Sequence, residues 1–158
     1  MLTFERTWDL GLVRQILTDP AVWPHVGDDF APPREEWTPS DDPRIWYVLA
    51  IEGSRPVGLF MFLPRSTVLW EAHVAFPFTR KRRSRGVNIA AGALAWMLEN
   101  STAERIIAEI PECNLLAVRL AEKVMRRFAV NEKSFKKGGV MRDLVLFGLS
   151  KGEYICRV

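Results

Sequence analysis

One short segment, Arg83-Ser84-Arg85-Gly86-Val87-Asn88, joins a β-type run to an amphipathic helical pattern. A loop that opens a helix leaves several backbone N–H groups unpaired, and the helix end adds partial positive charge behind them. The glycine has no side chain to keep an anion away from that backbone. Five basic residues between positions 80 and 85 add long-range attraction. The segment therefore predicts an anion site, although a solvated basic loop or a nucleic-acid patch would have the same composition.

Three β-type runs precede this segment and are separated by short turns. The runs cover Ile45–Ile51, Val57–Leu63 and Thr67–Phe76. Strands joined by short turns favour an antiparallel meander. Further upstream, the pattern predicts a strand at Leu2–Arg6, a helix at Asp9–Thr18, and a proline-rich stretch over 20–44 that is irregular or forms short helix.

Helical and β patterns alternate downstream of the segment. The predicted elements are a helix at about 87–99, a strand at Arg105–Ile110, a helix at Asn114–Phe128, a turn at Gly138-Gly139 and a strand at Met141–Leu149. The strand–helix–strand unit over 67–110 predicts a parallel strand pair with a right-handed crossover. The sheet is therefore expected to be mixed, with helices on its faces.

Length and composition restrict the class of protein. The chain has 158 residues, of which 48% are apolar and 26% are charged, so a disordered chain is excluded and one domain is expected. No apolar run reaches the roughly 18 residues that span a bilayer, and residues 1–5 lack the layout of a signal peptide. The two cysteines, Cys113 and Cys156, have no metal-ligand spacing. We therefore expect a cytoplasmic protein without a metal site.

The net charge of +3 is unevenly distributed, because the first half of the chain is acidic and the second half is basic. The acidic half contains the pairs Asp28-Asp29, Glu35-Glu36 and Asp41-Asp42. This asymmetry indicates two differently charged partners, or clustering on solvated faces without a functional role. A nucleic-acid partner is disfavoured, because no aromatic residue is interleaved with the basic run at 80–86.

A second stretch follows the predicted strand at Arg105–Ile110. It reads Asn114-Leu115-Leu116-Ala117-Val118-Arg119-Leu120-Ala121-Glu122-Lys123. Together with Arg83–Asn88, it resembles the GNAT superfamily of acyl-CoA-dependent N-acetyltransferases. That superfamily carries Gln/Arg-x-x-Gly-x-Gly/Ala after its fourth strand and Asn-x-x-Ala-x-x-Leu-Tyr-Glu-Lys after its fifth. This chain departs from the two patterns at Asn88 and Ala121. The resemblance covers roughly 45–149 by residues and the first 44 by element order.

The resemblance implies a fold and a set of cofactor contacts. The fold would be α/β (α+β), with a mixed, mostly antiparallel central sheet of about six to seven strands, helices on both faces, and one acyl-CoA-binding domain over 1–158. The co-substrate would be acetyl-CoA. Its pyrophosphate would lie on Arg83, Ser84, Arg85, Gly86, Val87 and Asn88, its thioester carbonyl on the backbone of Val74, Ala75 and Phe76, and its pantetheine arm near Asn114. Asn114 would also serve as a helix N-cap.

Two side chains in the predicted strand at Thr67–Phe76 are candidates for the catalytic base. Glu71 and His73 are two residues apart, so they share one strand face. A Glu on this strand is a frequent base in GNAT proteins, which makes Glu71 the first choice and His73 the second. A half-exposed strand face without a catalytic role is the alternative. Ala121 replaces the usual tyrosine acid, for which Tyr154 and Cys113 are candidate substitutes.

The sequence thus predicts an N-acetyltransferase that moves the acetyl group of acetyl-CoA to a primary amine by direct attack. The acidic pairs fall where GNAT proteins build their acceptor wall, which favours a cationic amine such as a polyamine, a lysine side chain or an aminoglycoside. The alternative is a GNAT-like protein that has weak or no activity and serves in binding or assembly, and that belongs to the small divergent GNAT-like chains that occur in phage genomes. GNAT proteins are often dimers, so a homodimer is also open.

Overall fold

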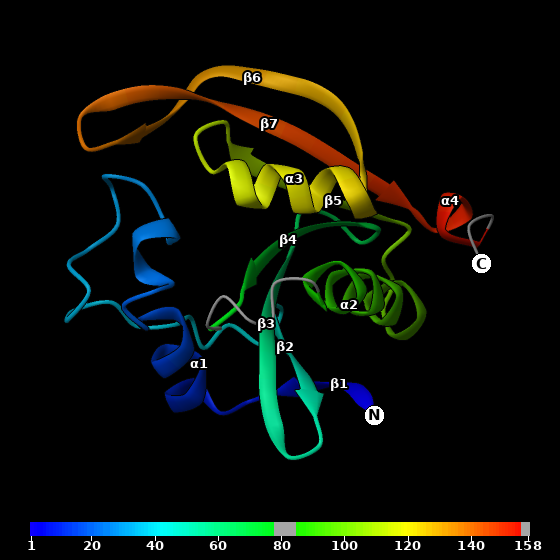
Figure 1. The fold of residues 1–158 in the computed structure, drawn as a ribbon. Helices are drawn as coiled ribbons and strands as arrows, with labels where there is room; N and C mark the ends of the chain where they lie inside the picture. Colours follow the sequence, from blue (N-terminus) through cyan, green and yellow to red (C-terminus); the bar gives the residue numbers. More distant parts are fainter. Residues whose placement is uncertain (78–84, 156–158) are drawn as a thin grey trace.

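The computed structural model describes residues 1–77 and 85–155 (Figure 1). The strands are β1 (Leu2–Thr7), β2 (Trp46–Glu52), β3 (Arg55–Pro64), β4 (Leu69–Ala75), β5 (Arg105–Pro111), β6 (Arg126–Lys137) and β7 (Val140–Ser150). The helices are α1 (Leu10–Leu17), the 3-10 turn η1 (Trp23–His25), α2 (Gly86–Asn100), α3 (Leu115–Val124) and α4 (Lys151–Ile155). These bounds place the meander and the helix at 87–99 within a few residues of the sequence prediction.

The described residues form one seven-stranded sheet in the order β1-β2-β3-β4-β5-β7-β6. Neighbouring strands from β1 to β4 are antiparallel, β4 and β5 are parallel, and β5, β7 and β6 are again antiparallel. The predicted parallel pair is therefore confirmed, with α2 between its two strands. The mixed, mostly antiparallel sheet with helices on both faces is confirmed as well.

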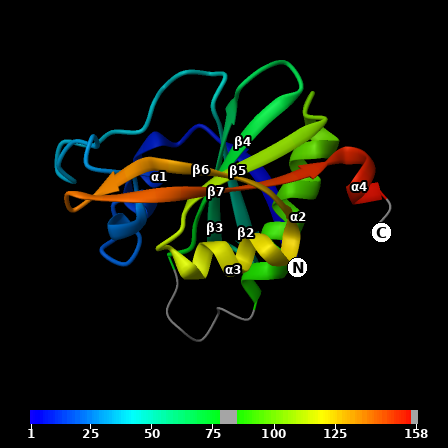
Figure 2. The ribbon, with the colours of Figure 1, turned by 90° about the horizontal axis from the view of Figure 1, so that it is seen from above.

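Alternation along the central strands divides the core between the two faces of the sheet. Val48 of β2 and Phe60 of β3 face the core shared with α2 and α3. Leu49 and Leu59, one position away, face the smaller core beneath α1. Figure 2 shows α1 and α2 on opposite sides of the sheet. Each of these four side chains is at least 95% buried, and such burial contributes about 1.5–3 kcal/mol per residue.

The ends of α1 are set by local chemistry. Asp9 accepts a hydrogen bond from the backbone N–H of Leu12 at 2.9 Å, an N-cap that contributes about 1 kcal/mol. The apolar positions Val13, Ile16 and Leu17 are buried. The helix ends at Leu17 because Pro20 follows, and the chain then continues through η1.

The predicted helix at Asn114–Phe128 is wrong in its second part. The helix α3 ends at Val124, Met125 is extended with φ −130°, and the chain continues directly into β6. The helical pattern extends as far as Phe128 by coincidence, but that side chain is 48% exposed and belongs to the strand. Pairing with β7, interrupted by irregularities between Arg127 and Ala129 and between Asn131 and Phe135, satisfies much of the β6 backbone.

The hairpin of β6 and β7 reaches across the molecule to the segment after η1 (Figure 1). Its turn is the predicted Gly138-Gly139 pair, whose φ angles of 58° and 76° favour glycine. The Asp29 carboxylate accepts hydrogen bonds from both turn N–H groups, at 2.7 and 2.9 Å. The backbone N–H groups of Gly139 and Gly138 hold the pKa of Asp29 below its ordinary value. Lys137 Nζ donates to the carbonyl of Gly27 at 2.9 Å.

Two features are absent from the described residues. None of their helices is long and apolar enough to cross a membrane. Nor do residues 1–77 and 85–155 contain a group of three His, Cys, Asp or Glu side chains that could hold a metal ion.

Candidate active site

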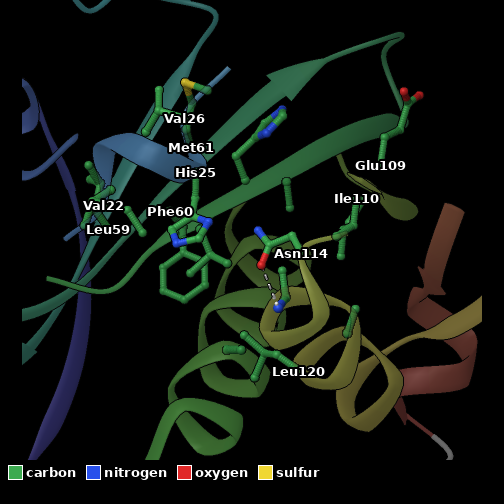
Figure 3. Close-up of a pocket in the computed structure, with 18 of the residues that line it drawn as sticks. Val22, His25, Val26, Leu59, Phe60, Met61, Glu109, Ile110, Asn114 and Leu120 are labelled. Carbon is green, nitrogen blue, oxygen red and sulfur yellow. Dashed lines mark hydrogen bonds between the residues drawn. The ribbon is translucent and has the colours of Figure 1, made fainter. Parts of the chain in front are cut away.

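A cavity lies where the parallel strands β4 and β5 separate. Their pairing joins Leu69–Glu71 to Arg105–Ile107 and ends there, although β4 continues to Ala75 and β5 to Pro111. The space beyond the last pair is a cavity of about 380 Å³ (Figure 3). Its lining comes from α1, η1, β3, β4, β5, α2 and α3, so it opens onto both faces of the sheet.

On the α2 and α3 face, the cavity lining is mainly small and apolar. Ala90 and Leu94 of α2 and Ala117, Leu120 and Ala121 of α3 line this side. Ala121 is 5% exposed, and its side chain is only a methyl group, so the cavity reaches the surface of α3 at this residue. Of the described residues, neither Tyr154 nor Cys113 lines the cavity. The two candidate substitutes for a tyrosine acid are therefore not at this site.

Asn114 is the polar side chain of that half of the cavity. It is the N-cap of α3, because its Oδ1 accepts a hydrogen bond from the N–H of Ala117 at 3.3 Å (Figure 3). The predicted capping role is confirmed. Within residues 1–77 and 85–155, the side-chain amide Nδ2 has no hydrogen-bond partner. It can therefore donate to a group in the cavity.

On the α1 face, the lining is apolar with a few polar groups. We call the apolar part the α1-side wall; it consists of Leu17, Val22, Val26, Trp37, Leu59 and Met61. The polar groups are two imidazoles, His25 and His73, and the carboxylate of Glu109. Figure 3 shows His25 beside the apolar wall, and Glu109 at the far edge of the group.

The two sequence-predicted catalytic residues are adjacent and differ in exposure. His73 lines the cavity with its side chain 44% exposed, whereas Glu71 is 4% exposed and lies behind it. His73 Nε2 is 2.8 Å from Glu71 Oε1, and Arg65 Nε donates to Glu71 Oε2 at 2.6 Å. Burial raises the pKa of the Glu71 carboxyl, but the hydrogen bonds and charges of His73 and Arg65 outweigh it and hold that pKa below its ordinary value.

This pairing determines which nitrogen of His73 can accept a proton. An ionised carboxylate only accepts hydrogen bonds, so Nε2 carries the hydrogen that it donates to Glu71. In the neutral imidazole, Nδ1 then holds the lone pair. The strand face shared by Glu71 and His73 is the one that also carries Leu59 and Met61 on β3, because Met61 pairs with His73 in register.

The predicted anion segment is described only from its third residue onward. Arg83 and Ser84 lie outside the described residues. Arg85 precedes α2, and its Nη1 lies 2.5 Å from Glu52 Oε1 in an exposed ion pair. Gly86 is buried, and a Cβ added there would lie 3.8 Å from the Phe76 ring and 4.0 Å from Leu120.

The first turn of α2 therefore lies beside a cavity residue, Leu120. Val87 is half-buried against the core and Asn88 is exposed. Val74 and Ala75 line the cavity from β4, whereas Phe76 packs edge-on against Phe60 with ring centroids 6.0 Å apart.

The chain is similar to known proteins in its three-dimensional structure. No protein-family model and no curated protein sequence matches the chain. Among solved structures, a spermidine N-acetyltransferase from Vibrio cholerae in complex with CoA and spermine superposes with a TM-score of 0.79 at 12% identity, over 98% of each chain. The aminoglycoside acetyltransferase AAC(6')-Ib with ribostamycin and coenzyme A gives 0.75 at 13% identity, over 98% of this chain and 96% of that one. A putative phosphinothricin N-acetyltransferase gives 0.70 at 17%, over 95% and 98%.

The chain has the GNAT fold. At identities of 12–17%, the similarity extends to the fold alone. In this GNAT fold the gap between β4 and β5 brings together the α1-side wall, His73 and Asn114 in one cavity.

The acidic pairs of the 28–42 segment are not part of the cavity lining. Asp29 holds the β6–β7 turn, and Asp28 Oδ1 accepts the N–H of Phe30 at 3.0 Å. Asp42 pairs with Arg44, whose hydrogen bonds lower the pKa of Asp42 to about 2. The carboxylates of Asp28, Asp29 and Asp42 therefore hold loop structure outside the cavity lining.

Sequence reasoning missed two polar residues of the cavity. His25 carries no signal in the sequence, and η1 places this exposed side chain beside the α1-side wall (Figure 3). Glu109 was not considered. Its position could have been found from the parallel pairing, because Glu71 pairs with Ile107, and His73 and Glu109 each lie two residues further along.

Proposed function

We propose that this chain is an acetyl-CoA-dependent N-acetyltransferase, one acyl-CoA-binding domain over 1–158 that acetylates a primary amine by direct attack. The observation that carries the proposal is the cavity that joins the two faces of the sheet between β4 and β5. The start of α2, which lies beside Leu120 on one side of the cavity, would bind the anion, and on the other side Glu71 holds the imidazole of His73. Two of the similar structures contain CoA, which supports this donor.

The donor side of the cavity fits acetyl-CoA. The backbone N–H groups of Gly86, Val87 and Asn88 begin α2, where a helix leaves such groups without intrahelical partners, and with Arg83–Arg85 they would hold the pyrophosphate. The free Nδ2 of Asn114 would donate to the pantetheine arm. The backbone of Val74, Ala75 and Phe76, at the end of β4, would hold the thioester carbonyl oxygen, where hydrogen bonds are most effective as charge develops.

We assign the base to His73 and a positioning role to Glu71, which reverses the order expected from the sequence. The base must reach the ammonium proton of the acceptor, and of the two residues it is His73 that lines the cavity. Nδ1 of His73 takes the proton. Glu71 holds the ring through Nε2, while Arg65 keeps the carboxylate ionised.

Acetyl transfer then needs no covalent enzyme intermediate. The deprotonated nitrogen attacks the thioester carbon and the C–N bond forms. The second proton of that nitrogen then passes to water, the C–S bond breaks, and CoA leaves as a thiolate. Among the described residues on the α3 side of the cavity, none has a side chain that could act as a general acid and donate a proton to the thiolate. A thiol has a pKa near 8.5, so a thiolate is a tolerable leaving group near neutral pH and can take its proton from water.

A binding or assembly protein of the GNAT fold is the second candidate. It is favoured by Ala121, which leaves no phenol at the usual position, and by the departure at Asn88. The cytoplasmic location and the homodimer expected from the sequence stay predictions.

The test is a titration of acetyl-CoA by calorimetry against wild type, Gly86→Trp and a control, Gly152→Trp. A side chain at Gly152 would meet nothing within 4 Å. We expect binding to wild type and to the control, and at least tenfold weaker binding to Gly86→Trp. Absence of binding at millimolar acetyl-CoA would refute the proposal.

If acetyl-CoA binds, thiol release is then measured across a panel of amines. Release that depends on both amine and His73 supports the enzyme. Binding with no release by any amine favours the binding or assembly protein.

A further inference from the structure

We propose that the acceptor is a small monoamine with an apolar aliphatic or aromatic body, rather than a polyamine or an aminoglycoside. The inference rests on the proposed function and specifies the substrate class of the same site. It follows from the α1-side wall, from the number of carboxylates in the cavity, and from how the wall is held.

The α1-side wall offers an acceptor carbon surface rather than hydrogen-bonding groups. Its six residues are all apolar except for the indole N–H of Trp37. An aliphatic or aromatic body gains free energy there by leaving water. A sugar ring would lose hydrogen bonds to water without replacement, because hydroxyl groups buried against such a wall have too few partners.

The charges of the cavity fit one ammonium group. Among the described lining residues, Glu109 is the only carboxylate. Glu109 is half-buried, and no described residue forms an ion pair or hydrogen bond with its carboxylate. Each further ammonium of a polyamine would have to leave water against the apolar wall without a counter-charge, which is costly.

Register places that carboxylate opposite the proposed base. Because Glu71 and Ile107 are the last pair of the β4–β5 ladder, His73 and Glu109 lie two residues beyond it on the same face, on either side of the gap. Glu109 can therefore attract the ammonium to the gap, and His73 can remove its proton. The body of the acceptor then lies against Met61, which is in register with His73, and against Trp37.

The wall is held in place before any ligand arrives. Arg14 of α1 donates to the carbonyl of Trp37 at 3.0 Å and to that of Glu35 at 2.9 Å. Trp37 also packs edge-on against Trp23, with ring centroids 6.1 Å apart. On the other side, Lys137 fixes Gly27. A wall pinned by backbone contacts to α1 and to the β6–β7 hairpin favours ligands that fit its shape and does not open readily for long polycations.

Size points the same way. The cavity of about 380 Å³ is at the low end of the roughly 300–1,000 Å³ typical of ligand sites, and the acyl end of the donor must share it. A small monoamine fits the volume that the donor leaves, whereas an aminoglycoside of three rings does not.

The experiment compares 2-phenylethylamine, n-hexylamine, spermidine and kanamycin with wild type and saturating acetyl-CoA. Thiol release gives kcat/KM, and calorimetry on the CoA-loaded protein gives amine binding without turnover. We expect kcat/KM for the two apolar amines to be at least tenfold above that for spermidine and kanamycin. Equal or better values for the polycations, or no binding of the apolar amines to the CoA-loaded protein, would overturn the inference.

Two variants locate the effect. Trp37→Ala should raise KM for 2-phenylethylamine at least tenfold while its effect on spermidine is small, and Trp8→Ala, at a 65% exposed tryptophan, should change neither. The wild-type panel decides the question even if Trp37→Ala folds poorly. Failure of acetyl-CoA to bind would refute the proposed function as well. Binding of acetyl-CoA with a preference for spermidine would refute only the proposal that the acceptor is an apolar monoamine.

Discussion

Replacing Glu71 by glutamine removes one buried charge and keeps the shape of the side chain. In the native protein this carboxylate is 4% exposed and is contacted by Arg65 on one oxygen and His73 on the other. Breaking a fully buried ion pair costs about 3–5 kcal/mol. Here the side chains of Arg65 and His73 are 52% and 44% exposed, so water can solvate both in the variant.

We therefore expect a loss of about 2 kcal/mol, the value for a hydrogen bond to a charged group. For a chain of this length that corresponds to a fall in Tm of about 4–8 °C. The matched control is Glu52→Gln, which removes a carboxylate that is 38% exposed and pairs with Arg85. A surface pair of this kind should cost less than about 1 kcal/mol.

The pH dependence gives a second measurement of the same contribution. The folded pKa of Glu71 is below the ordinary 4.5, so the stabilisation is fully present above pH 4.5 and is lost as pH falls through the lower folded value. Urea unfolding of both proteins between pH 7 and pH 3.5 should show a constant difference down to about pH 5 that shrinks below it. A cost no larger than that of Glu52→Gln, or a difference that grows with acid, would refute the reasoning.

Three other substitutions separate stability from binding. Gly86→Ala should leave Tm unchanged or raise it, because the new Cβ makes only ordinary contacts and alanine favours a helix. The same variant should bind acetyl-CoA several-fold more weakly. An unchanged dissociation constant argues against the helix start as the anion site. Gly92→Ala should cost about 1–3 kcal/mol in chemical denaturation, because its Cβ would lie 2.5 Å from the Phe4 ring; a more stable variant contradicts this packing. Asp29→Ala should speed hydrogen exchange at the amides of Gly138 and Gly139, and unchanged rates would show that the carboxylate does not hold the turn.

The element that the sequence concealed is β6. Most of its side chains are exposed, so it carries neither the alternation of a half-buried strand nor the stripe of a helix. Its stability comes from the ladder with β7 and from the contacts of the hairpin turn with Asp29, which are interactions between residues far apart in the chain. A pattern within one window cannot contain that information.

In the candidate site, too, some features follow from local sequence and others from tertiary contacts. Spacing placed Glu71 and His73 on one strand face, and a helix-capping residue type placed Asn114 at the start of α3. Spacing could not indicate which carboxylate or imidazole reaches the cavity. That choice depends on Arg65, which lies in the turn between β3 and β4 and donates a hydrogen bond to the Glu71 carboxylate.

By itself, the sequence of this chain determined the order of most elements, the parallel strand pair and the glycine-containing start of α2, because each of these follows from local periodicity and turn chemistry. Only the tertiary structure decided which elements meet at the cavity. The β4–β5 ladder ends at Glu71 and Ile107, and the gap beyond it brings Ala90 and Leu94 of α2, the capped start of α3 and the α1-side wall to one cavity. The same packing excluded the acidic pairs from that cavity, because Asp29 and Asp42 form their hydrogen bonds elsewhere. Those outcomes depend on contacts between distant segments, which no local pattern encodes.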